Sequence, residues 1–565
     1  MIMSIMKKTR NIFNNEFSGT KAKDHTEYIT QFYRSNGSSG IKASTVYCKE
    51  QLDGHGLDEI SIEKFPVDGV SGLMGRIVYP AWEPREVVLN IVDPVEEEIV
   101  NYNDTPTCIE WFSTPTPPGG VTAEIVDVRG GMMLEDYEGK DVKGKIVLAS
   151  GGGPLNMGVR LYELAVERYG ALGVVTDFLL GEIPGIRSRT LRPEFVGLLR
   201  QPRTFNKGWS IVISGTKGAR LRELLKMGPV KVWANVDTVE GAGTGENLIA
   251  VIKGSEKPDE EVFIVGHLSA TKPGGNCATG PALMIEAART LSQLIVKGDL
   301  PRPKRTIKFL FVPEGLGSEA YIKEHWEERE SMIGGLCLCG VGEDQGICRS
   351  SLVVSRTPDS VPSFMNDLCE HVLKEAVSKK LLTSGPMRYG IDPYSPFSDN
   401  SSFNLSGIPC VLLSSKPNLY FHTQFLTADK MDPEVFETAG SIVMETIYNV
   451  ADAGVETAME IANIVMEAAE SRLGEISTYS YEEIIESDPE NMEIVYKKGI
   501  KKLDYTLERD LRSLNSTSRL VRGLDDEKSY KAFLQESMAD LRAKGERVKE
   551  RVAAITRTKK GGTEG

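Results

Sequence analysis

The sequence predicts an α/β fold, and two patterns along the chain support that prediction. Continuous apolar runs of strand length occur at 262–266, 307–312 and 409–413. Helical periodicity appears beside them, at about 281–296 and 433–450. Runs that are apolar at every position are typical of strands whose two faces are both covered by helices. We therefore expect a sheet with helices on both sides at the centre of the molecule.

Composition narrows the class of protein further. The chain has 565 residues, 40% of them hydrophobic and 26% charged, with a net charge of −14. This length predicts three or four domain-sized units, and the negative charge argues against a nucleic-acid binder. The sequence shows neither a signal peptide nor a run of about 18 apolar residues, so we expect no membrane association. The eight cysteines lack zinc-finger spacing and predict a reduced, cytoplasmic protein.

The first fifth of the chain predicts one helical region and several short extended runs. Residues 1–20 are polar and are expected to be loose. Residues 22–55 carry apolar side chains at helix-like intervals. Extended runs begin at Glu59 and Arg76, and the Pro- and Gly-rich stretch 104–120 predicts loops.

A compact α/β unit is expected from about residue 121. Branched residues predict a set of strands, at 124–128, 145–149, 171–176, 210–213 and 230–236. A helix between the second and third of these strands closes at Gly170. Strand, helix and strand at this spacing are typical of an α/β unit.

The rest of the chain divides at about residue 452. Before that point, the helix expected at 281–296 has Pro281 in its first turn, where a missing N–H costs nothing. Beyond it, residues 453–475 and 490–555 are rich in Glu, Lys, Ala and Leu and poor in Pro and Gly. This composition predicts long amphipathic helices.

Three polar side chains come after predicted strands. They are His267, Glu314 and His422. The carboxyl ends of parallel strands meet at one edge of a sheet, where α/β proteins bind their ligands. Histidine and glutamate are zinc ligands, and a glutamate there is also suited to proton transfer. Taken singly, each residue has a plainer interpretation, as a hydrogen-bonded loop histidine or as the cap of the next helix.

Two other segments are candidates for the same site. The run Pro273-Gly-Gly-Asn-Cys-Ala-Thr-Gly opens a helix, and its small residues allow the backbone to approach a ligand or simply to turn. Ser398 and Asp399 precede the last predicted strand, and we expect them to contact a substrate. Cys337 and Cys339 lie on one face of a strand, as a soft-metal pair or as buried small hydrophobes.

In this order, the segments resemble the zinc aminopeptidases and glutamate carboxypeptidases that carry an inserted protease-associated domain. The resemblance covers roughly residues 25–450 and rests on blocks that begin at Val142, Asn247, Phe421 and Thr427. It implies an aminopeptidase-like, doubly wound mixed sheet with a protease-associated insert and a C-terminal helical extension. The domains it implies are a peptidase-type domain at 20–95 and 236–452, the insert at 96–235 and the extension at 453–565.

The resemblance also implies two zinc ions that share a bridging aspartate, with a glutamate as general base. Residue by residue, His267 and His422 match the two histidine ligands. Glu314 matches one member of a glutamate pair. Asn276 stands where the family has the bridging aspartate, and Cys339 where it has a second aspartate ligand.

These departures reduce the metal that the site is expected to hold. Ser269 replaces the aspartate that orients the first histidine, and Pro313 stands where a second glutamate is expected. Two zinc ions about 3.5 Å apart repel by roughly 19 kcal/mol at an effective dielectric near 20, and the remaining negative charge does not offset that repulsion. We therefore expect one zinc ion at most, or none, among a set of metal-site residues formed by His267, Asn276, Glu314, Cys339 and His422.

Three functions are compatible with these residues. The first, which we favour, is an aminopeptidase-like metal-dependent hydrolase of a small peptide or amide, with Glu314 as the catalytic residue. The second is a catalytically inactive protein of the same fold that serves binding or assembly. The third is a one-zinc acyl-transfer enzyme like the glutaminyl cyclases. We expect no nucleic-acid or membrane partner, and the C-terminal helices are predicted to pair two copies, to bind a partner or to pack on the main domain.

Overall fold

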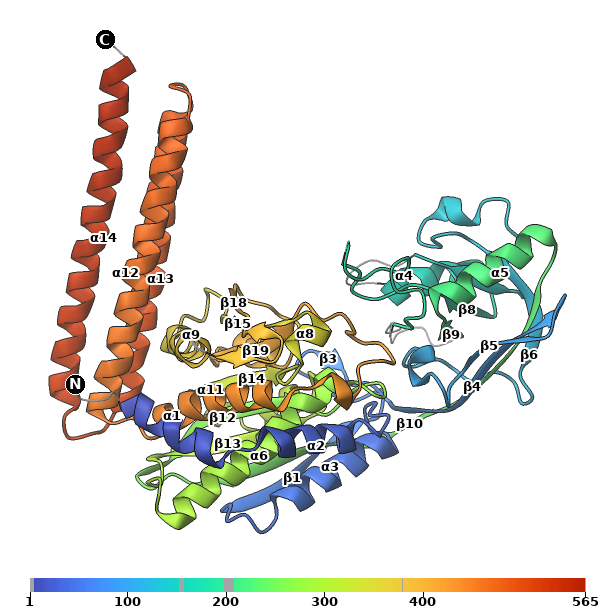
Figure 1. The fold of residues 1–565 in the computed structure, drawn as a ribbon, viewed down its shortest axis with the longest axis horizontal. Helices are drawn as coiled ribbons and strands as arrows, with labels where there is room; N and C mark the ends of the chain where they lie inside the picture. The colour runs from blue at the N-terminus through green and yellow to red at the C-terminus, as the bar shows by residue number, and fades with distance from the viewer. Residues whose placement is uncertain (1–4, 152–156, 184, 198–207, 379, 564–565) are drawn as a thin grey trace.

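The computed structural model describes residues 5–151, 157–183, 185–197, 208–378 and 380–563. These residues form two large sheets, helices packed on the larger sheet, and three long helices near the C-terminus (Figure 1). The predicted α/β class is confirmed. Over the described ranges, every helix is too short or too polar to cross a lipid bilayer.

The larger sheet has eight strands in the order β1–β11–β13–β12–β14–β19–β15–β18. Its four central strands are parallel: β13 (Arg305–Val312), β12 (Lys257–His267), β14 (Met332–Cys339) and β19 (Cys410–Lys416). The flanking strands are β1 (Glu59–Val67), β11 (Gly243–Ile252), β15 (Ser351–Ser355) and β18 (Tyr389–Asp392). Because β11 and β15 run antiparallel to their central neighbours, the sheet is mixed. The three apolar runs of the sequence are β12, β13 and β19, as predicted.

Successive residues of the central strands enter two different cores. On β12, Val262 and Ile264 belong to one core, whereas Phe263 and Val265 belong to the other. The first core is lined by α2 (Gly19–Ile29), α3 (Ser39–Leu52), α6 (Gly275–Lys297), α9 (Phe364–Val377) and α11 (Pro433–Ala451). The second is lined by α7 (Leu316–Glu324) and α10 (Asn400–Leu405). Burial of alternate side chains on the two faces explains why these strands are apolar throughout.

Residues 5–16 form a helix, so the prediction of a loose start was wrong for this part of the chain. Helix α1 spans Ile5–Glu16. Phe13 is fully buried, and the guanidinium of Arg10 donates to the carboxylate of Glu445 at 2.8 Å. These contacts are made with α11, which is distant in the sequence.

The helical region predicted at 22–55 is two helices, α2 and α3. Arg34 lies between them with its side chain fully buried. Its guanidinium donates to the carbonyls of Leu268 at 2.7 Å and Gly274 at 3.0 Å. The break therefore positions a side chain that joins the N-terminal helices to the end of β12.

Pro281 also differs from its predicted place. Helix α6 begins at Gly275, so Pro281 lies inside the helix instead of in its first turn. Its missing N–H removes the helical hydrogen bond to the carbonyl of Cys277. The helix begins earlier than its periodicity suggests because its first residues are small and closely packed.

The second sheet contains seven strands in the order β5–β4–β10–β6–β7–β8–β9. Their bounds are β4 (Ala81–Asp93), β5 (Glu97–Asn101), β6 (Val121–Asp127), β7 (Ile146–Ala149), β8 (Gly173–Thr176), β9 (Trp209–Val212) and β10 (Lys231–Gly241). Two strands of this sheet depart from the predicted domain boundaries. Strand β4 lies before the boundary at 95/96, and β10 crosses the boundary at 235/236. The two strands pair with each other in the second sheet. The division into domains otherwise stays a prediction.

Further helices and two separate two-stranded sheets, β2–β3 and β16–β17, lie outside the two large sheets. They are α4 (Met157–Tyr162), α5 (Gly215–Met227), α8 (Gln345–Cys348), β2 (Gly72–Leu73), β3 (Arg76–Ile77), β16 (Leu381–Leu382) and β17 (Gly385–Pro386).

The predicted C-terminal helices are confirmed, and they form an arm. The arm consists of α12 (Val455–Glu486), α13 (Met492–Ser516) and α14 (Glu527–Thr563). At about 1.5 Å per residue, α14 is roughly 55 Å long. Figure 1 shows the three helices side by side, projecting away from the sheets with the C-terminus at the far end.

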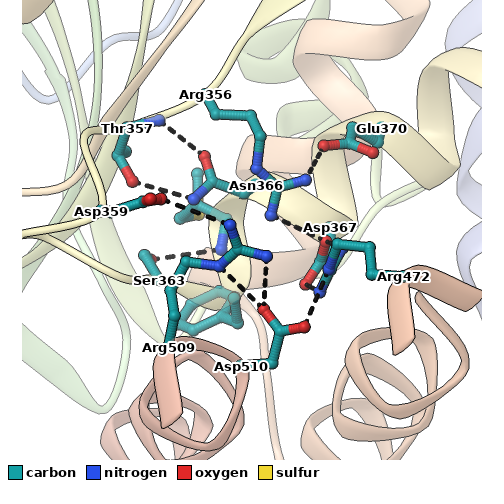
Figure 2. Close-up of polar contacts among 12 residues, drawn as sticks. Arg356, Thr357, Asp359, Ser363, Asn366, Asp367, Glu370, Arg472, Arg509 and Asp510 are labelled. Carbon is teal, nitrogen blue, oxygen red and sulfur yellow. Dashed lines mark hydrogen bonds and ion pairs between the residues drawn. The ribbon is translucent and has the colours of Figure 1, made fainter. Parts of the chain in front are cut away.

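A buried network of charges fixes the base of the arm to α9 (Figure 2). The carboxylate of Asp367 accepts from Arg472 of α12 at 2.6 Å and from Arg356 at 3.1 Å. Arg472 also donates to Asp510 of α13 at 2.9 Å. Burial by itself raises the pKa of Asp367, but the two guanidinium groups outweigh it and lower that pKa.

We expect Asp367→Asn to lower the free energy of unfolding by about 3 kcal/mol, because it leaves buried guanidinium groups without their shared carboxylate. Asp504→Asn is the matched control. Asp504 pairs with Lys549 on the exposed surface of the arm, and a surface pair contributes at most about 1 kcal/mol. Urea unfolding of both variants measures the difference. Equal losses of stability for the two variants would show that the network does not anchor the arm.

Candidate active site

The predicted site residues gather at the carboxyl edge of the four parallel strands. His267 is the last residue of β12, and Cys339 is the last residue of β14. Glu314 follows β13 by two residues, and Asn276 lies in the first turn of α6. The parallel pairing of these strands brings together residues that are far apart in the sequence.

His267 is held by a buried carboxylate. Its Nδ1 lies 2.9 Å from Oδ2 of Asp399, and both side chains are almost completely buried. The other oxygen of Asp399 accepts from the backbone N–H of Gly315 at 2.9 Å and from the hydroxyl of Ser318 at 2.7 Å. A carboxylate on one ring nitrogen fixes the imidazole and directs the other nitrogen at a ligand.

Both oxygens of Asp399 are engaged and its side chain is fully buried, so in this structure it orients His267. The predicted contact of Ser398 and Asp399 with a substrate stays a prediction. Ser269, which stands where an orienting aspartate was expected, accepts instead from the backbone N–H of Glu314 at 2.8 Å. Ser398 is buried and accepts from the thiol of Cys337 at 3.4 Å, away from the pocket described below.

The second nitrogen of His267 faces Glu314. Nε2 is buried, has no hydrogen-bond partner among the described residues, and lies 3.9 Å from Oε1 of Glu314. Burial lowers the pKa of His267, but the charge of Glu314 and contacts with Cys277 and Asp399 outweigh it and hold that pKa well above its usual value. Glu314 retains 20% of its side-chain exposure and can therefore reach both His267 and solvent.

The remaining predicted ligands lie around the same edge. Burial raises the pKa of the Cys339 thiol, and its contact with His267 opposes that rise. Asn276 is buried, and its side-chain oxygen has no hydrogen-bond partner in the described part of the chain. His422 adopts a left-handed backbone with φ of 55° and stacks on Phe421.

A small pocket opens at this edge, at the junction of the two sheets. Asn276, Cys277 and His422 line one side of it, and Thr107 and Trp111, which precede β6, line another. The indole N–H of Trp111 donates to the hydroxyl of Thr271 at 3.0 Å and so fixes the wall of the pocket. Sequence reasoning missed Trp111, because no pattern connects it with the strands of the larger sheet.

Glu343 is the other functional candidate that sequence reasoning missed. It follows β14 by four residues and is 1% exposed. Burial raises the pKa of its carboxyl to about 8, and Oε2 has no hydrogen-bond partner among the described residues. The signal that marked Glu314, a carboxylate soon after an apolar strand, also marks this residue.

The predicted ligand set carries little of the negative charge that offsets the repulsion between two zinc ions. Asn276 carries no charge, and burial disfavours the thiolate of Cys339. Within the ranges the structure describes, no three His, Cys, Asp or Glu side chains come together as metal ligands do. The buried Nε2 of His267, oriented by Asp399 and facing Glu314, has the chemistry of a ligand for a single ion.

Comparison with known proteins finds similarity to one family of peptidases. Residues 247–447 match Peptidase family M28. Carboxypeptidase Q of Bos taurus is 25% identical over 313 residues, which are 52% of this chain and 58% of the bovine protein. The chain thus spans just over half the length of that relative.

Two solved structures share the fold. A peptidase M28 precursor from Shewanella amazonensis has a TM-score of 0.58 and 21% identity, covering 80% of this chain and 97% of that one. A zinc aminopeptidase from Bacillus subtilis also has a TM-score of 0.58, with 18% identity, covering 77% and 96% of the two chains. The aminopeptidase-like fold predicted from the sequence is confirmed.

Proposed function

We propose, for a chain whose residues 247–447 form a domain of peptidase family M28, that the protein hydrolyses a small peptide or amide and uses at most one zinc ion. The observation that carries the proposal is the Asp399–His267 hydrogen bond, which leaves Nε2 directed at Glu314. The family consists of metallopeptidases, and a single ion agrees with the charge that this site retains.

Each residue of the site has a distinct role in the proposed reaction. His267 and Cys339 would hold the ion, which when bound activates water and polarises a carbonyl. Asp399 fixes the imidazole and keeps Nε2 facing the site. Glu314 holds or releases a proton 3.9 Å from that nitrogen.

The test is the zinc content of each chain after purification without chelators or added metal, measured by mass spectrometry. We expect about one equivalent, lost in His267→Ala. An absence of zinc, even after zinc is offered, would overturn the proposal and favour the second candidate, an inactive member of the fold. Asn276 at the bridging position favours that alternative. The predicted cytoplasmic location stays a prediction.

We expect the double variant Asn276→Asp and Cys339→Asp to raise the zinc content toward two ions per chain. Each change adds a carboxylate at a family ligand position, which offsets repulsion between the ions. The same measurement of zinc content checks it. Ser398→Asp is the control, because Ser398 hydrogen-bonds to Cys337 and matches no ligand position of the family, so its variant adds a carboxylate without adding a ligand. An unchanged zinc content in the double variant would show that these positions do not face the ion.

A further inference from the structure

The arm presents polar faces that the rest of the chain does not cover. Helices α12 and α13 pack against each other and against α14, and the buried network around Asp367 fixes their base. Large apolar side chains nevertheless remain exposed along the arm: Tyr479, Ile485, Ile494 and Tyr505 are between 54% and 66% exposed. Side chains of this kind supply apolar contact area where a helix surface meets a partner.

Helix α12 carries an acidic stripe. Over its length it has eight acidic residues and one basic residue. Four exposed glutamates lie within about a third of the helix circumference, at about 100° per residue, together with Tyr479. They are Glu467, Glu475, Glu482 and Glu486. None of these four makes a salt bridge to any described residue, and Glu475 accepts only from the hydroxyl of Ser471 at 3.4 Å.

Helix α13 carries a basic stripe with its own apolar residues. Ile494, Lys498, Lys501, Tyr505 and Arg512 follow one another at intervals of four, three, four and seven residues, so they share one face of the helix. All five are exposed. Lys498 is already paired with Glu483 at 2.9 Å. Lys501 and Arg512 form no salt bridge with the described residues.

The two stripes are neighbours on the surface of the arm. The ammonium of Lys502 lies 5.9 Å from the ring centroid of Tyr479, and the Lys498–Glu483 pair joins the same two helices. One continuous surface therefore has an acidic half on α12 and a predominantly basic half on α13, each with exposed aromatic or aliphatic side chains. Glu508 is an exposed acidic side chain on the α13 half, between Lys501 and Arg512 in the sequence. A surface that carries two complementary halves is complementary to itself after a twofold rotation.

We propose that this surface binds a second copy of the chain, with the α12 stripe of one protomer against the α13 stripe of its partner and the reverse contact across the twofold axis. A second copy of the chain presents a charge of opposite sign to both halves of the surface at the same time. A nucleic acid would meet the glutamates of α12 beside every lysine of α13, which disfavours it. The exposed Tyr479, Ile494 and Tyr505 supply the apolar contact that charge alone does not.

Charge exchange between the stripes tests the proposal. In the first variant, Glu475 and Glu482 become lysine, and in the second, Lys501 and Arg512 become glutamate. We expect the wild type to be a dimer by light scattering at low salt, and each variant alone to have a dimer dissociation constant raised at least about 100-fold. Equimolar mixing of the two variants restores the dimer, seen as a heterodimer by native mass spectrometry, because opposite charges then face each other.

A control variant separates this surface from net charge. Arg547→Glu with Arg551→Glu makes the same change in charge as the second variant but lies on α14, where both side chains are exposed. We expect it to remain a dimer, and circular dichroism verifies that every variant is folded. A monomeric wild type at micromolar concentration, or single variants that dimerise as well as the wild type, would overturn the proposal. Failure of the mixture to recover dimers would do so as well.

Discussion

Glu314→Gln lowers kcat/KM for small aminoacyl amides by about 100- to 10,000-fold, the range that a positioned general acid or base contributes. Glutamine retains the size of the side chain but cannot take a proton. Glu314 is the partly exposed carboxylate that faces Nε2 of His267, at 3.9 Å. Hydrolysis of a panel of aminoacyl p-nitroanilides by zinc-loaded protein measures the loss, and the zinc content of the variant is determined in the same preparation.

Glu319→Gln is the matched control for this result. Glu319 lies five residues further along, in α7, with a side-chain exposure of 21% against 20% for Glu314. Its carboxylate pairs with Arg76 at 2.8 Å instead of facing His267. We expect nearly wild-type activity from this variant. Equal activity of Glu314→Gln and Glu319→Gln, with zinc retained in both, would show that Glu314 takes no part in the reaction. It would favour the alternative of an inactive protein that serves binding.

The central sheet could be predicted from the sequence because its signal is local. Runs such as 262–266 are apolar throughout, since both faces of β12 are covered. The start of the chain gave no such signal. Helix α1 is stabilised by Phe13 and by the ion pair between Arg10 and Glu445, whose partners lie more than 400 residues away. Periodicity within a window of residues cannot show a contact of that kind.

The residues of the candidate site also differ in whether a local sequence signal predicts them. His267, Glu314 and Cys339 could be predicted at one edge, because each ends or follows a parallel strand. The role of Asp399 could not, since it reaches His267 from 132 residues away and its burial is a property of the packed structure. The family pattern suggested that the orienting carboxylate was lost at Ser269. The structure supplies one from the residue that precedes α10.

We expect the wild type to lose stability between pH 5 and pH 9. The variant Glu343→Gln removes most of that loss. Burial raises the pKa of Glu343 to about 8, from an ordinary value of 4.5. The folded state therefore binds this proton more tightly than the unfolded state does. The resulting stabilisation is fully present below pH 4.5 and is lost as the pH rises through 8. At about 1.36 kcal/mol for each pKa unit, the rise in the pKa of Glu343 from 4.5 to about 8 corresponds to a stabilisation on the order of 5 kcal/mol.

The measurement is the difference in unfolding free energy between the wild type and Glu343→Gln across that pH range. Taking the difference cancels the other groups that titrate, such as Asp452, whose pKa burial raises to about 6. We expect the variant to match the wild type near pH 5 and to exceed it increasingly toward pH 9. Glu286→Gln serves as the control, because Glu286 is equally buried but pairs with Arg289 at 2.7 Å.

Glu286→Gln and Glu343→Gln are expected to change the free energy of unfolding in opposite directions. Glu286→Gln leaves a guanidinium without its carboxylate and lowers stability at neutral and alkaline pH. Glu343→Gln removes a buried carboxylate that pairs with no cation among the described residues, so it raises stability at pH 9. A constant difference between wild type and Glu343→Gln from pH 5 to pH 9 would mean that Glu343 reaches solvent or a cation. Zinc that abolishes the pH dependence of the wild type would identify that cation and make Glu343 a part of the metal site.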